Sequence, residues 1–236
     1  MTGRRLWQSG RQPAAQGRLA ARPAPPGEAV ATGLQPLGLG AERDGLLYVP
    51  TGYLPDRPAP LALMLHGAGG DAHHGIYPFL DLADEAGLIL LAPDSRGATW
   101  DLLRGGYGPD VEFVDRALAH VFGRCAVDPT RIAAEGFSDG ASYALSLGMT
   151  NGDLFTHVVA FSPGFTSPGP EHGKPPLFIS HGIHDEVLPI DYCSRRIVPR
   201  VQRAGYAVRY EEFDGGHAMP PEIVAAALTW FLDKPG

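Results

Sequence analysis

The stretch RIAAEGFSDGASYALSLGM, residues 131–149, decides the fold. Residues 131–136 predict a short strand, and residues from about 139 to 149 predict a helix. Ser138 stands between them in the pattern Gly-x-Ser-x-Gly, where a tight strand-to-helix turn would project its hydroxyl outward as a nucleophile. The pattern alone is a weak signal, because an ordinary turn with a serine cap contains the same residues and this chain holds 31 glycines. The surrounding sequence has to decide between the two.

Apolar runs alternate with amphipathic segments along most of the chain. The predicted strands, besides 131–136, are residues 46–49, 61–65, 88–92, 158–161, 177–180 and 208–213; the further helices are 77–86, 111–122, 191–204 and 221–232. Such alternation builds a mostly parallel sheet with helices on both faces. We therefore predict an α/β fold in a single domain, residues 41–236. Residues 1–40, rich in Gly, Pro, Ala and Arg, predict an arm, either mobile or packed on the surface.

Composition excludes several classes of function. The chain of 236 residues carries a formal net charge of -7, whereas nucleic-acid binding needs a basic patch or stripe. No apolar run is long enough to span a bilayer, and the first 30 residues lack the apolar core of a secretory signal. We expect a cytoplasmic protein, either a monomer or a homodimer. The histidines do not have the spacing of a helical zinc motif, so neither a metal nor an organic cofactor is expected.

A glycine-rich segment follows the predicted strand at 61–65. In an open parallel sheet, ligands bind beyond the carboxyl ends of the strands. HGAGG, residues 66–70, stands at such an end, so the backbone N–H of Ala68 is a candidate donor to a developing oxyanion. The N–H of Asp139, at the start of the helix after Ser138, is the second candidate. The alternative for residues 66–70 is a flexible glycine turn.

An acid and a base follow two later strands. Asp185 lies in HGIHDEVLP, residues 181–189, and His217 lies in DGGHAMP, residues 214–220. A loop histidine can reach a serine hydroxyl with one ring nitrogen while a carboxylate orients the other. The chain order Ser138, Asp185, His217 is that of the α/β-hydrolase fold. Asp191 and Asp214 are alternative acids, but Asp214 is very near His217 in sequence and Asp191 is expected to open a helix.

Four stretches carry a resemblance to a known family. LMLHGAGG at 63–70, IAAEGFSDG at 132–140, SHGIHDEVLP at 180–189 and GGHAMPPE at 215–222 resemble the α/β-hydrolase superfamily, and within it the bacterial phospholipase/carboxylesterase family of serine esterases. The resemblance implies Ser138, Asp185 and His217 as the catalytic triad, and Ala68 and Asp139 as oxyanion donors. It implies no cofactor. Asp139 departs from the family, in which this position is often Gln, and its carboxylate could repel an oxyanion.

The expected function is therefore a serine carboxylesterase acting through an acyl-enzyme on Ser138. The loop at 165–176 is too short for a large helical lid, which favours short- to medium-chain or aryl esters. We expect the side chains on the active face to line the substrate pocket: Tyr77, Trp100, Leu188 and Met219. A lysophospholipase, a feruloyl-type esterase and a polyester hydrolase are alternatives on the same triad, as is the hydrolysis of thioesters or lactones. A binding protein without turnover is the alternative from another class.

Overall fold

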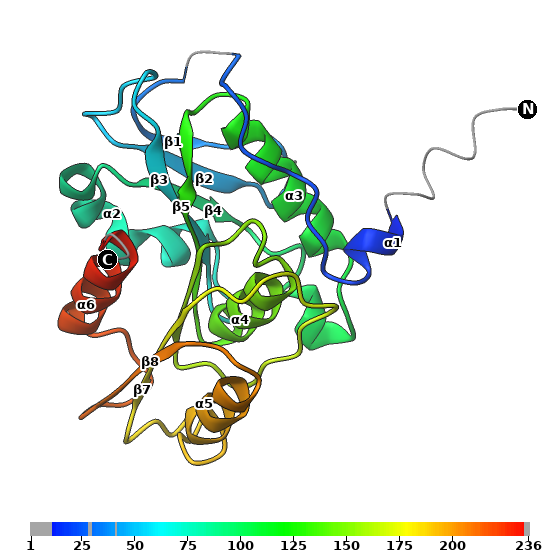
Figure 1. The fold of residues 1–236 in the computed structure, drawn as a ribbon, viewed down its shortest axis with the longest axis vertical. Coiled ribbons are helices and arrows are strands. Elements are labelled where there is room, and N and C mark those ends of the chain that lie inside the picture. Colours follow the sequence, from blue (N-terminus) through cyan, green and yellow to red (C-terminus); the bar gives the residue numbers. More distant parts are fainter. Residues whose placement is uncertain (1–10, 28–29, 41, 234–236) are drawn as a thin grey trace, which may run out of the picture.

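The protein, seen here in a computed structural model that describes residues 11–27, 30–40 and 42–233, is built on one eight-stranded sheet (Figure 1). The strand order is β1-β2-β4-β3-β5-β6-β7-β8. Strand β1 is antiparallel to β2 and β2 to β4, whereas the strands from β4 to β8 in this order run parallel. The first ten residues of the expected arm and the last three of the expected domain lie outside the described residues. The predicted α/β fold is confirmed.

After β3, helices separate successive strands along the chain, except between β6 and β7. The strands are β1 (Gly33–Pro36), β2 (Gly45–Val49), β3 (Ala59–Leu65), β4 (Ile89–Pro93), β5 (Val127–Phe137), β6 (His157–Phe161), β7 (Leu177–Gly182) and β8 (Val208–Phe213). The helices are α1 (Arg11–Ala14), α2 (Ala72–Ala86), the 3-10 helix η1 (Asp101–Arg104), α3 (Pro109–Phe122), α4 (Asp139–Thr150), α5 (Ser194–Arg203) and α6 (Pro221–Leu232).

Helices cover both faces of the sheet, and each face has its own core. One core joins the sheet to α3, α4 and α5, and the other joins it to α2 and α6; Figure 1 shows α2 and α6 on the side opposite α3 and α4. Strands β3, β4 and β7 are buried along their whole length. This double burial explains why they are continuous apolar runs in the sequence.

Several boundaries differ from those expected. Helix α2 begins at Ala72 and not at residue 77, because the carboxylate of Asp71 caps it by accepting from the N–H groups of His73 and His74. Pro78 therefore lies inside the helix. Helix α5 begins three residues later than expected and continues past Pro199. Strand β5 begins at Val127, four residues before the expected start.

The described part of the arm packs on the domain. Leu19 is buried, and its N–H donates to the side chain of Asn151 over 2.9 Å. Arg18 forms an ion pair with Asp153, so the segment is attached just beyond the end of α4. Farther along, β1 adds an antiparallel edge strand to the sheet. The arm thus completes the fold at two separate places.

Candidate catalytic site

Ser138 occupies a sharp turn between β5 and α4. Its backbone has φ 56° and ψ -117°, a left-handed conformation that favours glycine. The glycines on either side have a packing role. A Cβ at Gly140 would collide with the carbonyl oxygen of Leu65, and one at Gly136 would collide with the backbone of Gly140. These contacts let β3, β5 and α4 approach closely enough to make the turn.

The structure brings Ser138, His217 and Asp185 into one hydrogen-bonded chain. The His217 Nε2 atom lies 2.9 Å from the Ser138 Oγ atom, and His217 Nδ1 lies 2.6 Å from an Asp185 carboxylate oxygen, Oδ2. Asp185 follows β7, and His217 lies in the loop between β8 and α6. The Phe137 ring lies against the imidazole at a centroid distance of 4.7 Å. This arrangement is that of a nucleophile, a base and an orienting acid.

The environment of Asp185 favours its charged form. Burial alone would raise the pKa of this carboxyl, but hydrogen bonds from the Leu188 N–H and from His217 outweigh burial and lower the pKa. The Asp185 Oδ1 atom accepts from the N–H groups of Val187 and Leu188 over 2.9 and 2.8 Å. The carboxylate is thus held in position by its own loop, with Oδ2 directed at His217.

The two alternative acids are paired elsewhere. Asp191 bonds to Arg195 over 2.8 Å, and Asp214 lies 2.9 Å from His184. Both carboxylates are largely exposed. Asp185 is therefore the only one of the three expected candidates that contacts His217.

His181 is a buried neighbour of the acid that sequence reasoning did not single out. Its buried ring contacts the Ser194 hydroxyl through Nδ1 over 2.6 Å, and its Nε2 lies 2.7 Å from the Leu188 carbonyl oxygen and 3.1 Å from Asp185 Oδ2. Burial lowers the pKa of His181, which favours the neutral ring. The His-Gly-x-x-Asp spacing after a strand was the signal that could have singled it out.

The two expected oxyanion donors belong to segments that meet at Ser138: Asp139 follows it directly, and Gly67, the residue before Ala68, lies against it. Within the described ranges, no acceptor bonds to the backbone N–H of Ala68 or of Asp139. The loop that carries Ala68 is braced, because the N–H of Gly69 donates to the Ala98 carbonyl oxygen over 2.7 Å. The Thr99 hydroxyl donates to the carboxylate of Asp139 over 2.7 Å. One oxygen of this unusual carboxylate is thus engaged by a side chain outside the turn.

Trp100, which was expected to line the substrate pocket, is fully buried. None of its surface is exposed, because the ring stacks on Tyr143 at 4.9 Å between centroids. The indole N–H donates to the carbonyl oxygen of His66 over 2.9 Å. His66 itself accepts the N–H of Ser95 at Nε2, so its Nδ1 carries the proton and donates to the Gly67 carbonyl oxygen. Trp100 therefore supports the loop of residues 66–70.

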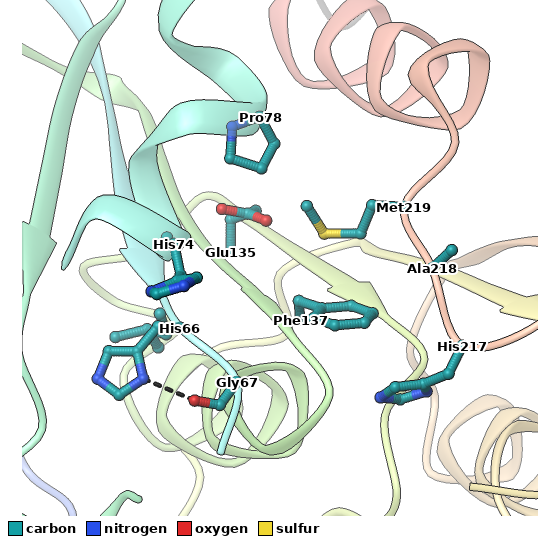
Figure 2. Close-up of a pocket in the computed structure, with 11 residues that line it drawn as sticks. His66, Gly67, His74, Pro78, Glu135, Phe137, His217, Ala218 and Met219 are labelled. Carbon is teal, nitrogen blue, oxygen red and sulfur yellow. Dashed lines mark hydrogen bonds between the residues drawn. The ribbon is translucent and has the colours of Figure 1, made fainter. Parts of the chain in front are cut away.

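A cavity of about 320 Å³ adjoins the site, and Met219, one of the residues expected to line the substrate pocket, is in its wall. Figure 2 shows Met219 and Phe137 on one side of this cavity, with Glu135 and Pro78 beyond them. Tyr77 lies outside this wall, on α2, where 57% of its surface is exposed. Leu188 also lies outside it, half-buried in the loop of Asp185.

Among the residues that the structure describes, no three His, Cys, Asp or Glu side chains gather as a possible set of metal ligands. No helix in the same part of the chain has the length and apolar character needed to cross a membrane.

Comparisons with known proteins point to esterases. No family model matches the chain. Feruloyl esterase C of Emericella nidulans is 32% identical over 158 residues, which cover 63% of this chain and 57% of that protein. The chain thus spans less than two thirds of the length of this curated relative.

Two solved structures illustrate the shared fold. The fluorophosphonate-binding serine hydrolase F of Staphylococcus aureus has a TM-score of 0.69 at 16% identity, covering 86% of this chain and 100% of that one. A ferulic acid esterase of Anaeromyces mucronatus has a TM-score of 0.60 at 18% identity, covering 86% and 89%. At these identities the likeness shows the fold, which is that of the α/β-hydrolases.

Proposed function

From the α/β-hydrolase fold that this chain shares with known esterases, we propose that it is a serine carboxylesterase that hydrolyses short- to medium-chain or aryl carboxylic esters. One observation carries the proposal: a continuous hydrogen-bonded chain runs from Asp185 through His217 to Ser138. The resemblance noted in the sequence agrees with it, since a curated relative found by sequence is a feruloyl esterase.

In the first half of the proposed reaction, Ser138 Oγ attacks the ester carbonyl carbon and His217 Nε2 takes the hydroxyl proton. Asp185 stabilises the imidazolium that forms and holds Nδ1–H toward itself. The free N–H groups of Ala68 and Asp139 donate to the oxyanion. Each such donor contributes roughly 3–4 kcal/mol to stabilising the transition state. His217 then returns its proton to the leaving alcohol, and an acyl group remains on Ser138.

In the second half, water attacks the acyl-enzyme with His217 again as the base. The same two backbone donors hold the second oxyanion. Collapse of that intermediate releases the carboxylic acid and returns the proton to Ser138 Oγ, so the enzyme is restored without any change of redox state. The chemistry needs no metal ion.

The structure of the loop between β6 and β7 favours small or aryl esters as substrates. Within these described residues, 162–176, the chain forms no helix. The loop is attached to α4 by hydroxyls four residues apart: Ser142, Ser146 and Thr150 each accept a loop N–H over 2.9 Å. A segment attached in this way does not act as a hinged lid, and an open site suits dissolved esters better than emulsified fat.

A feruloyl-type activity is the favoured alternative within this range, because the curated relative is a feruloyl esterase. A lysophospholipase and a polyester hydrolase remain open on the same triad. The cytoplasmic location and the monomeric or dimeric state stay predictions.

Hydrolysis of p-nitrophenyl esters from acetate to palmitate, by the native chain and by Ser138→Ala, tests the proposal. We expect turnover to peak at short or medium chains and to disappear in the variant. A fluorophosphonate probe should label the native chain and not the variant. Well-folded native protein that hydrolyses none of these esters and takes no label would refute the proposal.

A further inference from the structure

Glu135 is a carboxyl group in the middle of the sheet. It lies on β5, where the neighbouring residues 132–136 are all buried, and only 4% of its surface is exposed. Its Oε2 atom is buried and has no hydrogen-bond partner. A buried polar group without a partner costs about 1–3 kcal/mol. A residue retained at this cost calls for a ligand or a chemical role that the rest of the fold does not supply.

The Glu135 carboxyl lines the cavity beside the catalytic site. Glu135 and Phe137 are two residues apart on the same strand, so their side chains emerge on the same face. Both line the cavity of about 320 Å³, together with Gly67 and His217. In Figure 2, Glu135 lies toward Pro78, while Gly67 and His217 lie at the opposite side of the cavity. His217 bonds to the Ser138 hydroxyl, and Gly67 lies against the Ser138 side chain, so the cavity begins beside the nucleophile and reaches Glu135.

The chemistry of the wall restricts what fits. Pro78, Phe137 and Met219 present apolar surface, and both ring nitrogens of His66 already have partners. Burial raises the pKa of Glu135 well above its usual range, which favours the uncharged acid. An uncharged carboxyl both donates and accepts one hydrogen bond. Its natural partner is a hydroxyl, which also does both, carried on an apolar body.

The strand sets the distance. Ser138 stands three positions after Glu135 on the chain, so their Cα atoms lie at most roughly 10 Å apart at about 3.3 Å per residue. An ester carbonyl at Ser138 and a hydroxyl about 2.8 Å from the Glu135 carboxyl are therefore separated by roughly 5–10 Å. A para-hydroxyphenyl ring joined to the ester group by a short linker has this reach.

We propose that Glu135 is a specificity-determining residue that hydrogen-bonds a hydroxyl on an aromatic part of the ester substrate, bound in the cavity next to His217. This inference rests on the proposed esterase function and adds a substrate class to it. The hydroxyl could be carried by the acyl group or by the alcohol, and the experiment distinguishes these two sources.

The test compares matched pairs of esters that differ only in the hydroxyl. The acyl pair is methyl para-hydroxyphenylpropanoate and methyl phenylpropanoate; the alcohol pair is para-hydroxyphenylethyl acetate and phenylethyl acetate. For each pair, the ratio of the two kcat/KM values is measured in the native chain, in Glu135→Gln and in Glu135→Leu. The ratio within one variant cancels any general loss of activity. Glu135→Met is the second apolar replacement, used if Glu135→Leu does not fold.

We expect the native chain to prefer the hydroxylated ester in one pair by about tenfold. Glu135→Gln should keep most of this preference because an amide still donates and accepts, and Glu135→Leu should reduce the ratio to about one. A ratio near one in both pairs of the native chain would overturn the inference, since the carboxyl would then bind only solvent. A preference that survives in Glu135→Leu would also overturn it.

The same experiment separates this inference from the proposed function. Hydrolysis of the unsubstituted esters that disappears in Ser138→Ala supports the esterase function, whatever the ratio. If the folded native chain hydrolyses p-nitrophenyl esters but none of these four esters, only this inference is overturned; if it hydrolyses neither set, both proposals are overturned.

Discussion

Because its backbone is strained, the candidate nucleophile Ser138 is expected to lower the stability of the folded chain. A non-glycine residue in this conformation, with φ 56° and ψ -117°, costs about 1–3 kcal/mol. Glycine at the same position removes the strain but increases the entropy of the unfolded chain, at a cost of about 0.4–1 kcal/mol. The net expectation for Ser138→Gly relative to Ser138→Ala is a gain of about 1 kcal/mol. For a domain of this size, that corresponds to a rise of about 2–4 °C in Tm.

The comparison of Gly with Ala is the matched one, because both variants lose the hydroxyl and its bond to His217. Differential scanning calorimetry of the two proteins at the same pH measures the difference directly. We expect both to be inactive, with the glycine variant melting higher. An alanine variant that melts at the same temperature as the glycine variant, or above it, would show that the turn at Ser138 is not strained in solution.

Four further predictions follow from named contacts. Asp185→Asn should lower kcat by about 10⁴-fold, because an amide presents an N–H to the catalytic imidazole and favours the wrong tautomer; ester hydrolysis measures this. Trp100→Phe should destabilise the protein by about 1–3 kcal/mol in urea denaturation, since a carbonyl of the loop at 66–70 loses its donor. Asn151→Ala should cost about 2–3 kcal/mol and expose the arm to limited proteolysis, because the amide bonds three arm residues, Gly17, Arg18 and Leu19. Glu135→Gln should raise Tm more at pH 7 than at about pH 4. The pKa of the buried Glu135 carboxyl is raised in the folded chain, so the free energy of unfolding of the native chain falls as pH rises above the usual Glu range. Glutamine does not titrate, so the variant does not lose stability in this way.

The interior strands could be predicted from the sequence because burial on both faces leaves a simple signature. Residues 88–92 were expected as a strand, and β4 covers Ile89–Pro93. The edge strand β1 could not be predicted, since Gly33–Pro36 is only half-buried and owes its extended form to pairing with β2. The sequence placed the start of α2 five residues too late, because a proline such as Pro78 is typical of a first helical turn, whereas the Asp71 carboxylate caps the helix before Ala72.

The order of strands along the chain was enough to predict which residues meet at the candidate site. Ser138, Asp185 and His217 each follow a different strand, and parallel strands bring such positions to one edge of the sheet. The burial of a side chain in a loop could not be predicted in this way. Trp100 is buried because Tyr143 of α4 meets it face to face, and no local pattern around residue 100 indicates that contact. Sequence reasoning also did not identify Glu135, although a single carboxylate within an apolar strand indicates a buried acid.

The residues of the candidate site come from parts of the chain that are synthesised at different times. Ser138 and the loop of Ala68 belong to the part of the chain made first, whereas Asp185 follows β7 and His217 follows β8, the last strand. On the proposed function, a nascent chain carries a nucleophile that has no base until that edge strand has docked. Catalysis then begins only after the whole sheet is assembled, so the ability to hydrolyse an ester reports the completion of folding.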